Sequence, residues 1–160
     1  MNEKNQHLME MLPGLLSIAE KAGEAILQVY DVSDGTDTKD VAFTTKDDES
    51  PVTKADHAAH EVIEAGLRCV APEIPQLSEE GDIPSSEARS AWTQYWLIDP
   101  LDGTKEFINR NGEYTVNIAL IDNHQPVLGV VYVPVKKVFY YGVKGQGRWK
   151  KRSAGVRWIN

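Results

Sequence analysis

Apolar residues in the first half of the chain recur at the spacing of amphipathic helices. Within residues 12–30 they fall at positions 12, 15, 16, 19, 22, 26, 29 and 30, which matches one face of a helix. Pro13 is tolerated in the first turn of a helix, so we expect this helix to begin there. A second helix is predicted over residues 56–70, because apolar positions recur along it and prolines follow directly.

The second half of the chain has the pattern of a β-sheet. Residues 41–45 can form a strand, and residues 92–98 predict a buried strand that ends at Asp99. Turn-rich segments then separate three β-rich runs and predict an antiparallel meander; these runs are residues 114–121, 127–133 and 138–143. Helices followed by strands favour an α+β fold, with two helices packed on a largely antiparallel sheet.

Composition narrows the possible classes of protein. The 160 residues are one domain or part of a larger one, and 41% hydrophobic residues are enough for a core. No apolar run reaches the roughly 18 residues of a membrane helix, and the first residues lack the apolar core of a signal peptide. The single cysteine, Cys69, cannot form an internal disulfide, which favours the cytoplasm. We expect Cys69 to be buried on the second helix.

Charge is distributed unevenly along the chain. The net charge is −7, because residues 1–122 carry 24 acids and 9 bases (−15) and residues 123–160 carry 8 bases and no acid (+8). The acidic part argues against nucleic acid as a partner. The basic part is compatible with an anion-binding patch or with a solvated sheet edge, and we favour the edge.

The run from Asp99 to Thr104, DPLDGT, carries the candidate chemistry. Pro100 fixes the backbone directly after the strand, so Asp99 and Asp102 are expected on the same side of a sharp turn. Gly103 permits an unusual backbone conformation there. We expect Thr104 to cap a short helix whose free amides face the turn.

Two carboxylates this close repel each other, and a bound cation keeps both ionised at neutral pH. A site with oxygen ligands alone favours magnesium or manganese over zinc. An ordinary turn followed by a helix cap is the alternative interpretation of the same residues.

Residues 96–104, WLIDPLDGT, resemble the signature of the inositol monophosphatase superfamily of lithium-sensitive, magnesium-dependent phosphatases. The continuation KEF at 105–107 resembles its 3'(2'),5'-bisphosphate nucleotidase branch rather than the inositol monophosphatases. Three further segments agree in order and spacing, namely PVTKAD at 51–56, LSEE at 77–80 and GVVYVP at 129–134. The resemblance implies the N-terminal part of the layered α/β sandwich of that family.

By resemblance, a first magnesium would be bound by Glu79, Asp99 and the backbone carbonyl of Leu101. A second would be bound by Asp99 and Asp102. The family pattern selects Glu79 over Glu80, a choice that the residues alone leave open. Inhibition by lithium is implied as well.

The resemblance also assigns the substrate contacts. The amides of Gly103 and Thr104 would hold the substrate phosphate, and Asp56 would pair with the Thr104 hydroxyl to orient the attacking water. From the residues alone, Asp56 can equally be the N-cap of the second helix. Catalytic roles are therefore expected for Asp56, Thr104 and Glu79, and further substrate contacts for Glu79, Leu101 and Asp102.

The activity implied is hydrolysis of the 3'-phosphate of adenosine 3',5'-bisphosphate to AMP and phosphate, in sulfur metabolism. A catalytically inactive metal-binding fragment and an inositol monophosphatase-like phosphatase are the alternatives. The family has a further Asp, in a Trp-Asp motif expected beyond residues 1–160, that completes the second metal site. We therefore expect residues 1–160 to bind magnesium weakly and to hydrolyse bisphosphate nucleotides poorly or not at all. We expect self-association through an exposed sheet, no transmembrane segment, and a cytoplasmic location, with peripheral attachment to the inner membrane as the alternative.

Two other patterns are not interpreted as sites. His57 and His60 lie three residues apart and could imitate a metal pair, but so polar a helix surface favours solvated side chains. The glycine-rich segment 142–147 lacks the Lys-Ser/Thr of a phosphate-binding loop, and a hairpin turn is expected there.

Overall fold

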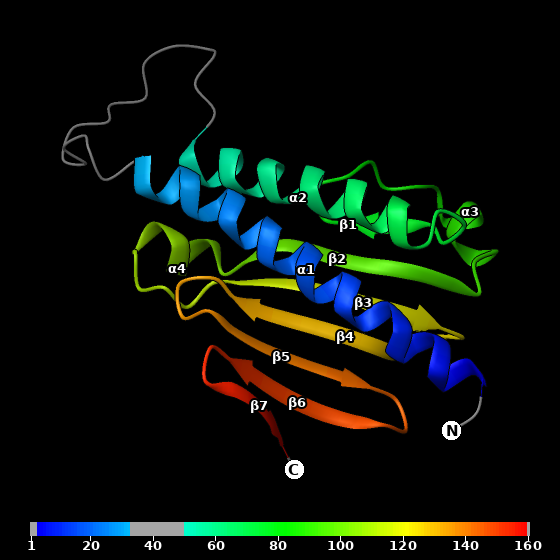
Figure 1. Ribbon diagram of the computed structural model, residues 1–160. Coiled ribbons are helices and arrows are strands. Elements are labelled where there is room, and N and C mark those ends of the chain that lie inside the picture. The colour runs from blue at the N-terminus through cyan, green and yellow to red at the C-terminus, as the bar shows by residue number, and fades with distance from the viewer. Residues whose placement is uncertain (1–2, 33–49, 160) are drawn as a thin grey trace.

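The computed structural model describes residues 3–32 and 50–159. Two long helices, α1 (Glu3–Val32) and α2 (Pro51–Val70), pack side by side on one face of a seven-stranded sheet (Figure 1). Helix α1 crosses β3, β4 and β5, whereas α2 lies over β2. The predicted strand at residues 41–45 lies outside the described residues. In the described part of the chain, neither long helix is apolar enough to cross a membrane.

The strands follow one another through the sheet in sequence order. The first pair, β1 with β2, is parallel, and every later pair is antiparallel. The predicted meander and its hairpin after residue 142 are therefore confirmed, while β1, β6 and β7 are additional. The strands are β1 (Gln76–Ser78), β2 (Gln94–Asp102), β3 (Thr115–Asp122), β4 (Gln125–Val133), β5 (Val138–Val143), β6 (Gly147–Arg152) and β7 (Gly155–Trp158).

Helix α1 begins at Glu3, ten residues before the predicted start at Pro13. An internal proline removes a helical hydrogen bond at a cost of about 3 kcal/mol. The earlier residues offset that cost by burial, since Leu8 and Met11 are 4% and 6% exposed. Lys4 also forms an ion pair with the buried Asp122 of β3, 2.5 Å between nitrogen and oxygen. Tertiary contacts therefore extend the helix through Pro13.

Helix α2 also begins earlier than predicted. Ser50 is its N-cap and accepts a hydrogen bond from the Thr53 amide, while Pro51 occupies the first helical position, where its missing N–H removes no helical bond. Asp56 therefore lies in the second turn, and its expected role as an N-cap is wrong.

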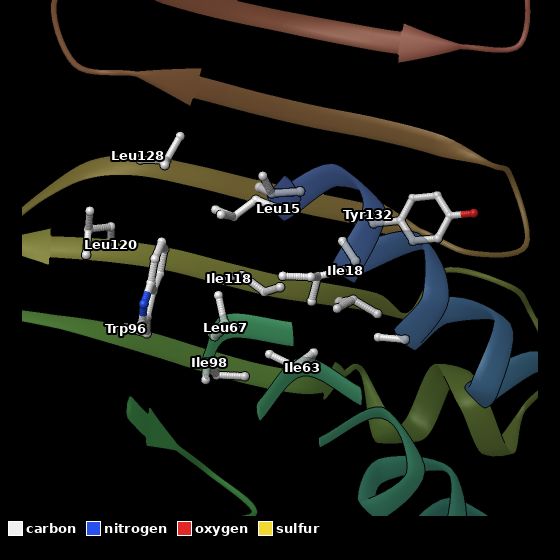
Figure 2. Close-up of a cluster of buried hydrophobic side chains, with 14 of the residues drawn as sticks. Leu15, Ile18, Ile63, Leu67, Trp96, Ile98, Ile118, Leu120, Leu128 and Tyr132 are labelled. Atoms are coloured by element: carbon white, nitrogen blue, oxygen red, sulfur yellow. The ribbon is translucent and has the colours of Figure 1, made fainter. Parts of the chain in front are cut away.

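The core lies between the helices and the sheet. Leu15 and Ile18 of α1 meet Ile63 and Leu67 of α2 over alternate residues of the strands (Figure 2). The strand residues labelled in Figure 2 are Trp96, Ile98, Ile118, Leu120, Leu128 and Tyr132. Cys69 is exposed, because two residues turn a helix by about 200° away from the buried Leu67. Its predicted burial is wrong.

The opposite face of the sheet is not covered by either long helix. Leu97 and Val131 point from β2 and β4 to this open face and are 44% and 38% exposed. Five of the eight basic residues of the last 38 positions lie on β6 and β7, which extend the sheet beyond the helices (Figure 1). Lys150 and Lys151 lie over the rings of Tyr140 and Phe139, respectively.

Candidate metal and phosphate site

The parallel pairing of β1 with β2 brings Glu79 beside Asp99. Ser78 is in register with Ile98, and the Glu79 amide donates to the Ile98 carbonyl at 3.2 Å. Glu79 directly follows β1, and Asp99 is the next residue of β2. Carboxylates that lie far apart in sequence therefore meet at one end of the strand pair. The sequence pattern did not predict β1 or its pairing.

Strand β2 continues through Pro100 to Asp102, so the predicted strand end at Asp99 is wrong. Asp99 pairs with Asn117 and Asp102 with Thr115, which leaves one extra residue on β2. A β-bulge accommodates that residue. Pro100 is tolerated because it lies in this bulge and beyond the residues of β2 that pair with β1. The Leu101 amide donates a hydrogen bond to the Asp99 carboxylate. The bulge therefore folds the backbone of the DPLD segment around Asp99.

Asn117 connects the two aspartates and was not among the predicted site residues. It is the register partner of Asp99, and its Nδ2 donates to Asp102 Oδ2 at 3.1 Å. Thr115 donates in turn to Asn117 Oδ1 at 3.0 Å. The one signal in the sequence is an amide side chain inside the apolar run TVNIALI. Such a residue on a central strand indicates a polar contact on one face of the sheet.

The pKa of Asp99 is raised by its surroundings, which include two other acids. Burial raises the pKa of Asp99 to about 6, and repulsion by Glu79 and Asp102 adds to the rise. The hydrogen bond from the Leu101 amide opposes it. Without a counter-charge, burial and the two neighbouring carboxylates therefore disfavour the ionised form of Asp99.

Asp56 faces the same acids from helix α2. Burial is the main cause that raises its pKa to about 8, followed by a hydrogen bond with Glu80 and repulsion by Glu80, Asp99 and Glu79. Its Oδ1 atom is buried and has no hydrogen-bond partner. Asp56 hydrogen-bonds Glu80 in this arrangement, and its expected pair with the Thr104 hydroxyl stays a prediction.

Gly103 and Thr104 begin the short helix α4 (Thr104–Ile108). Gly103 is its N-cap in the left-handed conformation, with φ of 97°, and no side chain caps the helix. Thr104 is the first helical residue, so its expected role as the helix cap is wrong. A Cβ at Gly103 would lie 3.1 Å from Glu106 Oε2 and 3.3 Å from the Tyr114 Cα. Glycine is therefore required here by both conformation and space.

The donors around Asp99 are all oxygens, the ligands that magnesium and manganese prefer. Glu79 and Asp102 are both near enough to repel Asp99. Asp56 is repelled by Glu79 and Asp99 in turn, and its Oδ1 atom is buried without a hydrogen-bond partner. Within residues 3–32 and 50–159, no three acids, histidines or cysteines stand in ligating arrangement. The residues fit a hard cation in their chemistry, and binding one requires the carboxylates to move closer together.

A groove of about 330 Å³ begins at Glu79 and Asp99 and continues along the open face of the sheet. Its floor is formed by small and apolar residues of β2, β3 and β4, including Leu97, Ala119 and Gly129. The acids therefore stand at the end of an open channel, where a ligand can reach them.

The fold and this group of acids around Asp99 define the class of protein. The sequence profile of the inositol monophosphatase family matches residues 7–156, and the chain belongs to that family. The 3'(2'),5'-bisphosphate nucleotidase CysQ of Salmonella typhimurium is 56% identical over 147 residues, which are 92% of this chain and 56% of that protein. The protein of the same name from Shigella flexneri is 58% identical with the same coverage.

A solved structure agrees with both the family and the fold. The crystal structure of CysQ from Bacteroides thetaiotaomicron, a bacterial member of the inositol monophosphatase family, is 44% identical in sequence and similar with a TM-score of 0.73. The match covers 94% of this chain and 53% of that one. The chain spans about half the length of the curated relatives it matches. The family resemblance and the expected fold class are confirmed.

Proposed function

We propose that this chain carries the metal-binding part of a magnesium-dependent phosphomonoesterase that hydrolyses the 3'-phosphate of adenosine 3',5'-bisphosphate to AMP and phosphate. The observation that carries the proposal is that Glu79, directly after β1, meets Asp99 of β2 beside Asp102 and the first residues of α4. Similarity to relatives named 3'(2'),5'-bisphosphate nucleotidase supports this choice of substrate.

In this proposal Glu79, Asp99 and the Leu101 carbonyl hold one magnesium ion, and Asp99 and Asp102 hold a second. Bound magnesium supplies Lewis-acid chemistry and stabilises charge on the leaving oxygen. Asn117 keeps Asp102 oriented through the hydrogen bond to its Oδ2. Neutralisation by the cations also explains how an acidic surface accepts an anionic substrate.

The remaining residues act on substrate and water. The Gly103 and Thr104 amides, which have no partner inside the helix, donate to the phosphate oxygens. Asp56 accepts a proton from the attacking water, which the Thr104 hydroxyl helps to orient. Neutralisation of the surrounding carboxylates by bound cations favours deprotonation of Asp56, since these acids contribute, after burial, to its raised pKa.

The proposal includes a cellular setting. A role in sulfur metabolism and inhibition by lithium follow from the resemblance to the nucleotidase branch. The single cysteine supports a cytoplasmic location, with the cytoplasmic face of the inner membrane as the alternative. Self-association through the open sheet face is part of the same proposal.

The test is phosphate release by the purified chain from adenosine 3',5'-bisphosphate, with and without magnesium. Release that requires magnesium, that Asp99→Asn abolishes and that Asp82→Asn leaves unchanged would support the proposal, because Asp82 is an exposed acid outside the site. Inositol 1-phosphate serves as the competing substrate, and faster release from it would assign the inositol phosphatase activity instead. Magnesium binding without turnover of either substrate would identify an inactive metal-binding fragment.

A further inference from the structure

Helix α2 contacts the end of β1 through a histidine that the proposed chemistry does not use. His60 Nδ1 lies 3.0 Å from the Ser78 hydroxyl oxygen. Both residues are well shielded, because the His60 side chain is 16% exposed and Ser78 is 6% exposed. Ser78 directly precedes Glu79, so this hydrogen bond fixes the backbone from which the candidate ligand extends.

The tautomer of His60 is indicated by its second neighbour. Glu64 lies one turn further along α2, with its carboxylate 3.7 Å from His60 Nε2. A negative charge at that distance favours the tautomer with hydrogen on Nε2. His60 Nδ1 then accepts the hydrogen bond that the Ser78 hydroxyl donates.

The same helix face holds the turn at a second point. Asp56 lies four residues before His60, and its carboxyl shares a hydrogen bond with Glu80. Positions four residues apart lie one above the other on a helix. His60 and Asp56 therefore contact Ser78 and Glu80, the residues that flank Glu79.

Close packing completes the contact. The turn formed by residues 78–81 closes with a hydrogen bond of 3.3 Å from the Gly81 amide to the Ser78 carbonyl. A Cβ at Gly81 would lie 3.3 Å from His60 Cε1, nearer than ordinary van der Waals contact. The His60 imidazole thus packs against the backbone of the 78–81 turn and also forms a hydrogen bond with the Ser78 side chain.

We propose that His60 is a positioning residue that holds the 78–81 turn so that Glu79 projects toward Asp99. The part of this inference that concerns metal affinity rests on the proposed function. Residues behind metal ligands change affinity by about 10- to 100-fold when they are removed. His57, on the same helix but exposed, provides a matched control.

Hydrogen exchange of the chain without divalent cations tests the positioning itself. In His60→Ala the Glu79 and Gly81 amides should exchange between about two- and tenfold faster, the effect of one lost hydrogen bond on a local opening equilibrium. His57→Ala should leave both rates unchanged. His60→Asn should restore slow exchange, because its side-chain oxygen can take the place of Nδ1. Equal rates in wild type and His60→Ala would overturn the inference.

Calorimetric titration with magnesium chloride tests the consequence for the site. His60→Ala and Ser78→Ala should each bind magnesium about tenfold more weakly, and the double variant should be no weaker than either. Unchanged affinity in His60→Ala would overturn the link to the site. Absence of magnesium binding by the wild-type chain would instead overturn the proposed function, and the exchange rates would still decide whether His60 holds the turn.

Discussion

Asp56 is buried and has other carboxyl groups beside it, and both features determine its protonation. Burial and the neighbouring acids raise its pKa from the ordinary value of 3.8 to about 8. Between those two values the folded chain holds a proton that the unfolded chain has released. The free energy of unfolding must therefore fall as the pH rises through that window.

Asp56→Asn should remove this contribution, because an amide has no proton to lose. In the absence of divalent cations, the thermal midpoint of the wild type should fall more between pH 5 and pH 8 than that of the variant. Asp82→Asn, at an exposed position, is the control and should follow the wild type. An equal fall in Asp56→Asn and the wild type would show that Asp56 is not protonated in the folded chain.

Asn117 should matter for metal affinity more than for folding. Asn117→Ala removes the 3.1 Å hydrogen bond to Asp102, so magnesium should bind about tenfold more weakly. The residue is partly exposed, so the free energy of unfolding should change by about 1 kcal/mol or less. Titration and thermal unfolding measure the two effects, with the exposed Asn109→Ala as control. A large loss of stability without a loss of affinity would contradict this role.

The candidate acids differ in how far the sequence could identify them. The sequence could identify Asp99 and Asp102, because their spacing around Pro100 predicted that both lie on the same side of a turn. The choice of Glu79 over Glu80 came only from the family pattern, since that choice depends on a parallel pairing between segments about 20 residues apart. Asn117 was missed because one amide in an apolar strand carries little local signal.

At the level of elements, the start of α1 is tied to the turn between β3 and β4. The buried Asp122 accepts hydrogen bonds from Gln94 and Asn123 at 3.2 Å and 2.7 Å, in addition to its ion pair with Lys4. The bond from Lys4 is the largest cause that lowers the pKa of Asp122. This carboxylate therefore links α1 to the sheet through residues that lie far apart in the sequence.

Asp122→Asn should destabilise the fold by about 2 kcal/mol near neutral pH, the usual effect of losing hydrogen bonds to a charged group. Because the folded pKa is lowered, the stabilisation is present above the ordinary value of 3.8 and is lost as the pH falls through the lower folded value. Denaturant unfolding at pH 7 and pH 2.5 should show the difference from wild type shrinking in acid. A difference that is the same at both pH values would contradict the ion pair.

Periodicity predicted the existence of α1, α2 and the β2–β5 meander but not their limits. Pro13 and Pro51 show why. A local rule places the start of the first helix at Pro13, whereas burial of Leu8 and Met11 extends the helix back to Glu3. The start of α2 at Pro51 depends on a cap from Ser50 that the apolar pattern does not contain. The short β1 has three residues and is defined only by its partner.

At the scale of the whole molecule, the open sheet face changes character from one edge to the other. One row of registered residues runs from acid through amide and apolar groups to bases; it consists of Asp99, Asn117, Val131, Tyr140, Lys150 and Arg157. A second copy related by a two-fold axis near Val131 would place the basic edge of each chain over the acidic end of the other. Such complementarity steers association, and exposed apolar side chains at the centre favour it.

We therefore expect the chain to self-associate through this face. Sedimentation velocity over a range of protein concentrations should show reversible association that salt weakens, because screening reduces the attraction between the two edges. Val131→Lys places a charge at the apolar centre and should keep the chain monomeric. Ile83→Lys, at a residue that is 67% exposed and outside the sheet, should associate like the wild type. Equal association of the two variants, or a wild type that stays monomeric at every concentration, would rule out this interface.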